Sequence, residues 1–211
     1  MKRLLILVAF ANTLFCTAQY MAIPDPNFEN YLEQNGIGDG VPNNGVVLKA
    51  NIENITSLII YSKGIQDLTG IEDFAAVELI NCANNNLPLL DVSQNMNLWA
   101  LNCQSSNVVE LHLPPTASLE ILNCPENFLT ALDISQNPGL EQLYCNINNI
   151  GSLDLTNNPV IELVYIEYNN ISGFLDTSQN PILSSLSASH NNIIGFELSE
   201  NSELRSFGAA D

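Results

Sequence analysis

An apolar pattern that recurs about every 21 residues limits the possible folds of this chain more than any other feature. Its first position holds Val77, Leu98, Leu119, Leu140, Ile161, Leu183 and Leu204. A unit of this length is too short to bury an apolar face by itself, so neighbouring units must stack in register to form a continuous core. The sequence therefore predicts a solenoid in which seven such units are stacked.

Further columns follow at fixed offsets within each unit. The third residue after the first position is again apolar: Ile80, Leu101, Leu122, Leu143, Val164, Leu186 and Phe207. Two residues later comes the Cys column, which comprises Cys82, Cys103, Cys124 and Cys145 and continues as Ile166 and Ala188. This alternation predicts one short strand per unit, with the columns pointing into the core.

A polar column follows three residues after the Cys column. This Asn column consists of Asn85, Ser106, Asn127, Asn148, Asn169 and Asn191. An inward amide can bond to backbone groups where the chain turns, so we expect each Asn to bond to its own coil and to a neighbouring coil. The repeated columns account for much of the 30 Leu and 30 Asn in 211 residues.

Each unit also carries a Leu-Asp-x segment that predicts a second short strand. The expected strands lie at 90–92, 132–134 and 153–155. Most units close with Ser/Thr-x-Asn, often followed by Pro, as in Ser135-Gln136-Asn137-Pro138. This arrangement leaves little room for a helix in any unit.

The pattern L-x-x-L-x-C-x-x-N-x-L-x-x-L-D-x-S-x-N-P resembles the leucine-rich repeat family, most closely the short internalin-like repeats of exported Bacteroidetes-type bacterial proteins. The resemblance runs from about Ile55 to Phe207, with a degenerate first unit at 55–76 and regular units from Val77. It implies a mostly β solenoid with a parallel sheet on its concave face and second short strands on the other face. A non-catalytic binding function is the corresponding expectation.

The first 18 residues read as a signal peptide. Lys2 and Arg3 precede an apolar run that ends at Phe15, and we expect cleavage after Ala18. The alternative is a lipoprotein signal that uses Cys16. The mature protein is expected to be secreted or displayed on a bacterial cell surface.

Residues 19–54 are predicted to form an N-terminal cap with a small helix. The cap helix has a clear start and a clear end. Asp25 is expected to act as its N-cap with Pro26 at the first helical position, and Gly36 is expected to end it. The segment 35–40 is similar to a calcium loop but lacks the alternating acids and the final Glu. We therefore expect no calcium there and no other cofactor.

The acidic balance excludes whole classes of partner. The chain has 23 Asp and Glu against 5 Lys and Arg, a formal net charge of −18. Removal of residues 1–18 takes away two bases and no acid, which makes the charge of the mature chain −20. So few bases cannot neutralise nucleic acid or an anionic membrane, and no segment after the signal is long and apolar enough to insert into a membrane.

The four mature cysteines occupy one inward column rather than disulfide positions. Parallel side chains on neighbouring rungs lie too far apart for easy bridging, so we expect buried thiols that pack as small hydrophobes. The alternative is a Cys82–Cys103 or Cys124–Cys145 bridge. Zinc is not expected because the sequence has no C-x-x-C pair.

The sequence offers few candidate catalytic residues. The two histidines, His112 and His190, stand in different columns of distant units, and no Ser or Cys lies at a motif spacing from either. We therefore expect no enzyme.

An acidic column lies in the segments expected to form the second strands. It consists of Asp91, Asp133, Asp154, Asp176 and Glu197. Its carboxylates either accept hydrogen bonds from their local turns or form a weak cation ladder.

The residues expected on the concave sheet are the candidate binding site. In the strands this column reads Asn81, Asn102, Asn123, Tyr144, Tyr165 and Ser187, and it is flanked by Trp99, Glu120, Glu141 and Glu162 and followed by Glu167 and Tyr168. Aromatic and amide groups suit a protein or a surface glycan, although they are also ordinary residues for an exposed sheet. The residues that we expect to bind a partner are Trp99, Asn102, Asn123, Glu141, Tyr144, Glu162, Tyr165 and Tyr168.

Two other roles are also compatible with these sequence features. One is a structural or adhesion module of the cell envelope without a discrete ligand, and a more remote one is a non-catalytic part of a secreted enzyme system. A last coil that starts at Leu204 would leave a sheet edge uncovered, so oligomerisation through this C-terminal edge is a further expectation.

Overall fold

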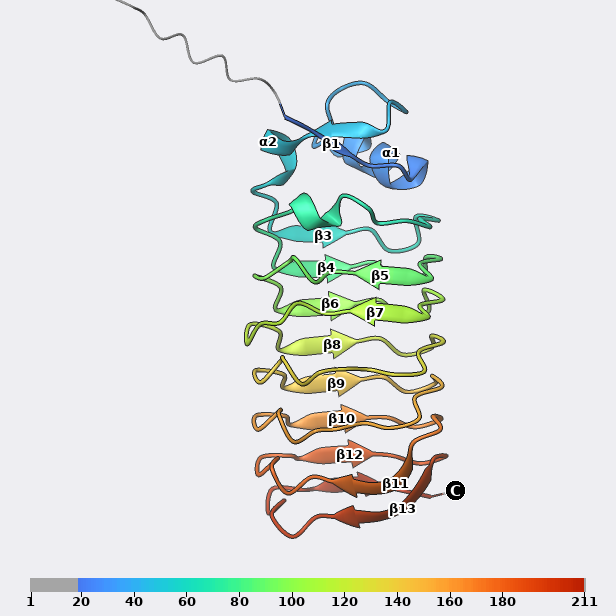
Figure 1. Cartoon of the computed structure of the whole chain (residues 1–211), viewed down its shortest axis with the longest axis vertical. Coiled ribbons are helices and arrows are strands. Elements are labelled where there is room, and N and C mark those ends of the chain that lie inside the picture. Colours follow the sequence, from blue (N-terminus) through green and yellow to red (C-terminus); the bar gives the residue numbers. More distant parts are fainter. Residues whose placement is uncertain (1–18, 211) are drawn as a thin grey trace, which may run out of the picture.

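Coils of one repeat stack along a single axis, and each coil adds one rung to a parallel sheet (Figure 1). The computed structural model describes residues 19–210. The N-terminal cap covers one end of the stack, and the last strands lie at the other end. The predicted mostly β solenoid of the leucine-rich repeat type is confirmed.

The long sheet holds the first strand of every unit. Its eight strands are β3 (Ser57–Ile59), β4 (Leu79–Asn81), β6 (Ala100–Asn102), β8 (Ile121–Asn123), β9 (Gln142–Tyr144), β10 (Leu163–Tyr165), β12 (Ser185–Ser187) and β14 (Ser206–Gly208). Neighbouring strands pair in strict register, so that Leu143 lies beside Leu122 and Val164. This register follows from the repeat, because a one-residue slip would turn every apolar side chain to the outside.

The inward columns form one continuous core. The first-position residues from Val77 to Leu183 and the whole Cys column are fully buried. Near the open C-terminal end burial decreases, and Phe207 is 47% exposed. Burial of aliphatic side chains between coils is the main driving force for stacking.

The second face of the solenoid is less regular than predicted. It contains two separate pairs of parallel strands, β5 (Leu89–Asp91) with β7 (Glu110–His112) and β11 (Ser172–Asp176) with β13 (Asn192–Glu197). The strands predicted at 132–134 and 153–155 are wrong, because these segments do not form strands. Backbone hydrogen bonds join these two coils before the Leu-Asp-x segment, for example from the Asn149 N–H to the Leu129 carbonyl, but they do not continue into it. In addition, the coil that precedes residues 132–134 contains Pro114 and Pro115, which have no N–H group to donate.

The N-terminal cap joins a helix to a small antiparallel sheet. Its elements are β1 (Tyr20–Ala22), α1 (Pro26–Gln34), β2 (Val46–Leu48) and α2 (Lys49–Ile52), and the first coil adds the 3₁₀ helix Ile71–Asp73. The predicted N-cap is confirmed, since Oδ1 of Asp25 accepts hydrogen bonds from the N–H groups of Asn27 and Phe28. Oδ2 of Asp25 accepts hydrogen bonds from the N–H groups of Gln66 and Asp67, which ties the cap to the first coil.

The Asn column links each coil to the coils beside it. The amide oxygen of Asn127 accepts from the N–H groups of Ser106 and Val108 in the preceding coil, at 3.0 and 2.9 Å. Its amide nitrogen donates to the carbonyls of Cys103 and Cys124, both at 3.0 Å. One buried side chain therefore satisfies backbone groups of two coils.

A second amide column lies where each unit closes, and its role is not predicted from the sequence. We call it the turn Asn column: Asn95, Asn137, Asn158, Asn180 and Asn201. Its side chains are almost completely buried and donate to backbone carbonyls of the preceding coil, as Asn158 does to Ile134 and Asn137. The Ser/Thr-x-Asn closure was visible in the sequence, but turn-type residues of this kind do not by themselves reveal that the amide points inward.

Candidate binding surface

The outward residues of the long sheet form one row across its strands. In register this row reads Asn81, Asn102, Asn123, Tyr144, Tyr165 and Ser187, as the repeat predicts. All six side chains are partly exposed. Strand pairing thus brings together residues that lie far apart in the sequence.

Two tyrosines stack at the middle of this row. The ring centroids of Tyr144 and Tyr165 are 5.1 Å apart with an interplanar angle of 19°. The Tyr144 hydroxyl donates to Oε1 of Gln142, and the Tyr165 hydroxyl accepts from Ser185. Partial burial raises the pKa of Tyr144. The strands thus position a rigid aromatic surface with both hydroxyls in place.

The side chain of Asn123 differs from its neighbours in the row. Oδ1 of Asn81 and Oδ1 of Asn102 each accept a hydrogen bond from the N–H group two residues later. After Asn123 that place is taken by Pro125, which has no N–H group to donate. Among the described residues the Asn123 amide makes no side-chain hydrogen bond, so it can bond to a ligand beside Tyr144.

Carboxylates flank the row on the side where the chain enters each strand. Glu78, Trp99, Glu120, Glu141 and Glu162 occupy successive rungs and are linked by their backbones. The ion pairs found among residues 19–210 do not involve any of these four glutamates. The sheet face therefore combines aromatic rings with uncompensated negative charge.

Tyr168 lies apart from the sheet face on which the repeat pattern predicts it. It stands three residues beyond Tyr165 in the loop that leaves the sheet, with φ 55° and 56% of its surface exposed. Its ring stacks on His190 of the next coil, with a centroid distance of 4.3 Å. Tyr168 thus belongs to the rim of the surface and not to its centre.

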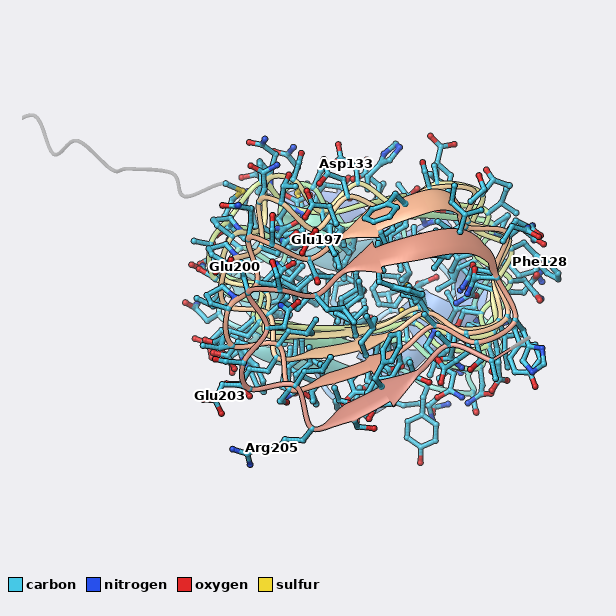
Figure 2. All side chains as sticks on the ribbon, turned by 90° about the horizontal axis from the view of Figure 1, so that it is seen from below. Phe128, Asp133, Glu197, Glu200, Glu203 and Arg205 are labelled. Atoms are coloured by element: carbon cyan, nitrogen blue, oxygen red, sulfur yellow. The ribbon has the colours of Figure 1, made fainter. Side chains whose placement is uncertain are left out.

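The acidic column on the second face makes local turn bonds. The carboxylates of Asp91, Asp133, Asp154, Asp176 and Glu197 each accept from the N–H group two residues later. The bond from Ser135 lowers the pKa of Asp133, and the bonds from Ser178 do the same for Asp176. Figure 2, a view along the stack, places Asp133 and Glu197 on this face and Arg205 on the side of the long sheet.

His112 makes the main electrostatic contact on the second face. Its Nε2 lies 2.8 Å from Oε1 of Glu110, and its Nδ1 lies 3.5 Å from Oδ2 of Asp91. The bond to Glu110 raises the pKa of His112. His190 is in a different coil against Tyr168, so the two histidines do not form a common site.

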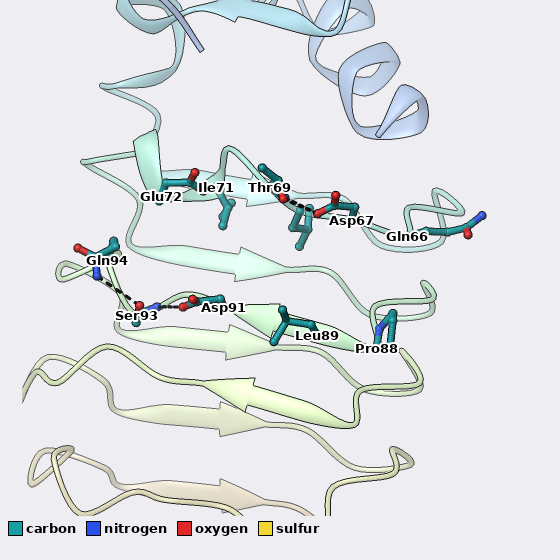
Figure 3. Close-up of a pocket in the computed structure, with 11 residues that line it drawn as sticks. Gln66, Asp67, Thr69, Ile71, Glu72, Pro88, Leu89, Asp91, Ser93 and Gln94 are labelled. Atoms are coloured by element: carbon teal, nitrogen blue, oxygen red, sulfur yellow. Dashed lines mark hydrogen bonds between the residues drawn. The ribbon is translucent and has the colours of Figure 1, made fainter. Parts of the chain in front are cut away.

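A hollow of about 600 Å³ opens on the second face between the first two coils (Figure 3). Asp67, Thr69, Glu72 and Asp91 are among the residues that line it, and Asp67 and Asp91 are engaged with Thr69 and Ser93. Within residues 19–210 no group of three His, Cys, Asp or Glu is placed to hold a metal ion. The hollow is thus a groove between coils with internally bonded polar groups.

The Cys column lies deep in the core. Cys82, Cys103, Cys124 and Cys145 are fully buried and are free thiols among the described residues. Desolvation raises the pKa of Cys82 and of Cys145 to about 12. The reactive thiolate form is therefore strongly suppressed in the folded chain.

The folded chain without residues 1–18 is accordingly expected to resist iodoacetamide at neutral pH. The physical reason is that alkylation needs an accessible thiolate, and burial denies both access and charge. Mass spectrometry after brief labelling should detect no modification in buffer and four modified thiols in denaturant without reductant. A disulfide would instead leave two fewer thiols to label in denaturant, which would contradict the assignment of free cysteines.

The signal peptide expected at 1–18 and the alternative use of Cys16 lie outside the described residues. None of the helices in the described part of the chain is long and apolar enough to cross a membrane.

Comparison with known proteins agrees with the fold. No protein-family model and no curated protein matches the sequence. Among solved structures, the functional domain of InlJ from Listeria monocytogenes, described as including a cysteine ladder, is 30% identical with a TM-score of 0.67. The match covers 92% of this chain and 48% of that domain, so the chain spans about half the length of this neighbour.

A second solved structure extends the likeness at the level of the fold. Internalin C2 from Listeria monocytogenes str. 4b F2365 has a TM-score of 0.55 and 19% identity, with 90% of this chain and 96% of that chain covered. The 21-residue repeat, the eight-stranded parallel sheet and these neighbours agree in one assignment. The chain has the fold of an internalin-like leucine-rich repeat solenoid.

Proposed function

We propose that this chain is an exported, non-catalytic binding module that holds a protein partner on the outward face of the long sheet. The observation that carries the proposal is the stacked pair Tyr144–Tyr165 beside the unbonded amide of Asn123. Aromatic side chains fixed on a rigid frame dominate many protein interfaces because they bury a large area at small entropic cost. The internalin-like neighbours support a binding role of this kind.

The composition of the row also argues for a discrete partner rather than a plain spacer. A spacer needs no special residue on its exposed sheet, whereas the outward row changes from Asn in β4, β6 and β8 to stacked Tyr in β9 and β10. The change is confined to two adjacent coils of the described solenoid. An envelope or adhesion role without a ligand remains the alternative, and a surface glycan remains the alternative ligand.

The test is an array of extracellular proteins and glycans probed with the chain that lacks residues 1–18. The proposal predicts protein spots whose signal falls at least about tenfold in Tyr144→Ala/Tyr165→Ala, because truncation of two interface aromatics commonly removes several kcal/mol of binding free energy. Both side chains are partly exposed, so circular dichroism should show an unchanged fold.

The matched control removes two other exposed tyrosines. Tyr20→Ala/Tyr61→Ala changes residues that are each 54% exposed in the cap and the first coil, away from β9 and β10. This control should bind like the unaltered chain. Equal binding by the Tyr144/Tyr165 variant would remove the site, and glycan spots alone would change the class of the partner.

A further inference from the structure

We infer that the partner segment held on the long sheet is basic, namely an extended polypeptide stretch rich in Arg and Lys that lies along the stack across β8, β9 and β10. The inference rests on the proposed function and names the chemistry of its partner. It is carried by the charge of the face, the tyrosine stack and the unbonded amide of Asn123 beside it.

The carboxylates of this face form a regular row. Glu120, Glu141 and Glu162 stand on consecutive rungs, with the N–H of Glu141 bonded to the carbonyl of Glu120 at 2.9 Å and the N–H of Glu162 bonded to the carbonyl of Glu141 at 2.8 Å. Rungs of a sheet are about 4.8 Å apart, so the three negative charges repel one another. A cation that bridges them removes this repulsion.

The described part of the chain supplies no such cation near these rungs. Its Lys and Arg residues are Lys49, Lys63 and Arg205. Lys49 pairs with Asp73 and Lys63 lies over Tyr31. Arg205 stands on the same flank two rungs beyond Glu162 and pairs with Glu203. The charge of the face is thus complementary to a basic partner.

The aromatic groups add a second feature that favours the same partner. Tyr144 and Tyr165 belong to the strands that Glu141 and Glu162 precede, so the ring stack and the carboxylates share two rungs. A guanidinium group can stack on a tyrosine ring while its N–H groups bond to a carboxylate. This combination favours Arg in particular.

The amide next to the stack is also free to bond. The side chain of Asn123 offers a donor and an acceptor that match the main chain of an extended peptide.

The experiment measures fluorescence anisotropy with a labelled peptide of alternating Arg and Ser, and uses a peptide with Glu in place of Arg as the negative control. Glu120→Gln/Glu141→Gln/Glu162→Gln is expected to weaken binding of the Arg peptide about eightfold, since an exposed ion pair contributes a factor of about two. The Tyr144→Ala/Tyr165→Ala variant should weaken it as well. Added salt should weaken binding by the unaltered chain.

The control for net charge removes three other exposed carboxylates. Glu72→Gln/Glu110→Gln/Glu200→Gln changes the charge by the same amount at residues outside the long sheet, and it should weaken binding by less than about twofold. Equal losses in the two triple variants, or no binding of the Arg peptide at low salt, would overturn the inference. A protein partner on the array that depends on the tyrosines but not on the three glutamates would also overturn it, while leaving the proposed function intact.

Discussion

Replacement of Asn127 by Ala is expected to destabilise the folded chain by about 3 kcal/mol or more, because several buried backbone groups lose their partners together. Asn127 is 5% exposed and bonds to Ser106, Val108, Cys103, Cys124 and Pro125. Alanine leaves the two N–H groups and the carbonyls without these bonds, and the site is too deep for free access of water. Urea denaturation monitored by circular dichroism gives the change in midpoint.

Asn149→Ala is the matched control for this prediction. Asn149 lies in the next coil, is exposed and makes no side-chain hydrogen bond among the described residues. Its substitution should change the free energy of unfolding by less than about 0.5 kcal/mol. Similar midpoints for Asn127→Ala and Asn149→Ala would show that the Asn column does not hold the coils together.

Leu143→Ala is expected to cost about 2–5 kcal/mol through the cavity that it opens in the middle of the stack. Leu143 is fully buried in β9 and pairs with Leu122 of β8 and Val164 of β10. In a linear array each coil is stabilised chiefly by its neighbours, so one central cavity weakens both interfaces. Thermal unfolding should therefore occur at a lower midpoint and broaden into less cooperative transitions.

Gln142→Ala serves as the control on the same strand. Gln142 is partly exposed, and its side chain accepts one hydrogen bond, from the Tyr144 hydroxyl at 3.3 Å. Its removal should lower the midpoint only slightly, since an exposed hydrogen bond contributes about 1 kcal/mol or less. A Leu143→Ala chain that melts like this control would contradict the picture of coils coupled through one core.

Structural features that recur in every coil can be predicted from the sequence. Features in which a single coil differs from the repeat cannot. The period and the apolar columns give the long sheet and its register, because only one face of each strand can be buried. The outward row from Asn81 to Ser187 follows from the same alternation. The candidate residues of this row therefore lie side by side in the structure, as the spacing predicts.

The departures depend on contacts that one unit cannot reveal. The segments 132–134 and 153–155 have the same Leu-Asp-x pattern as β5, yet they form no strand, since a strand exists only where the adjacent coil offers matching donors and acceptors. Tyr168 shows a different limit: a positive φ recurs at its position in the repeat, as at Ile147 and His190, and turns it to the rim while Tyr165 stays on the sheet. The stacking of Tyr144 on Tyr165 could be expected from the register, but the free amide of Asn123 depends on the absence of an N–H group in Pro125.

The turn Asn column has a consequence for how such a chain lengthens in evolution. Each of these side chains donates hydrogen bonds to the preceding coil. Asn201 donates to the carbonyls of Thr177 and Asn180. Asn180 in turn donates to the carbonyls of Leu155 and Asn158. A duplicated stretch of 21 residues therefore brings its own attachment to the coil before it and offers the same carbonyls to the coil after it. Gene duplication can thus insert whole coils without compensating changes in their neighbours.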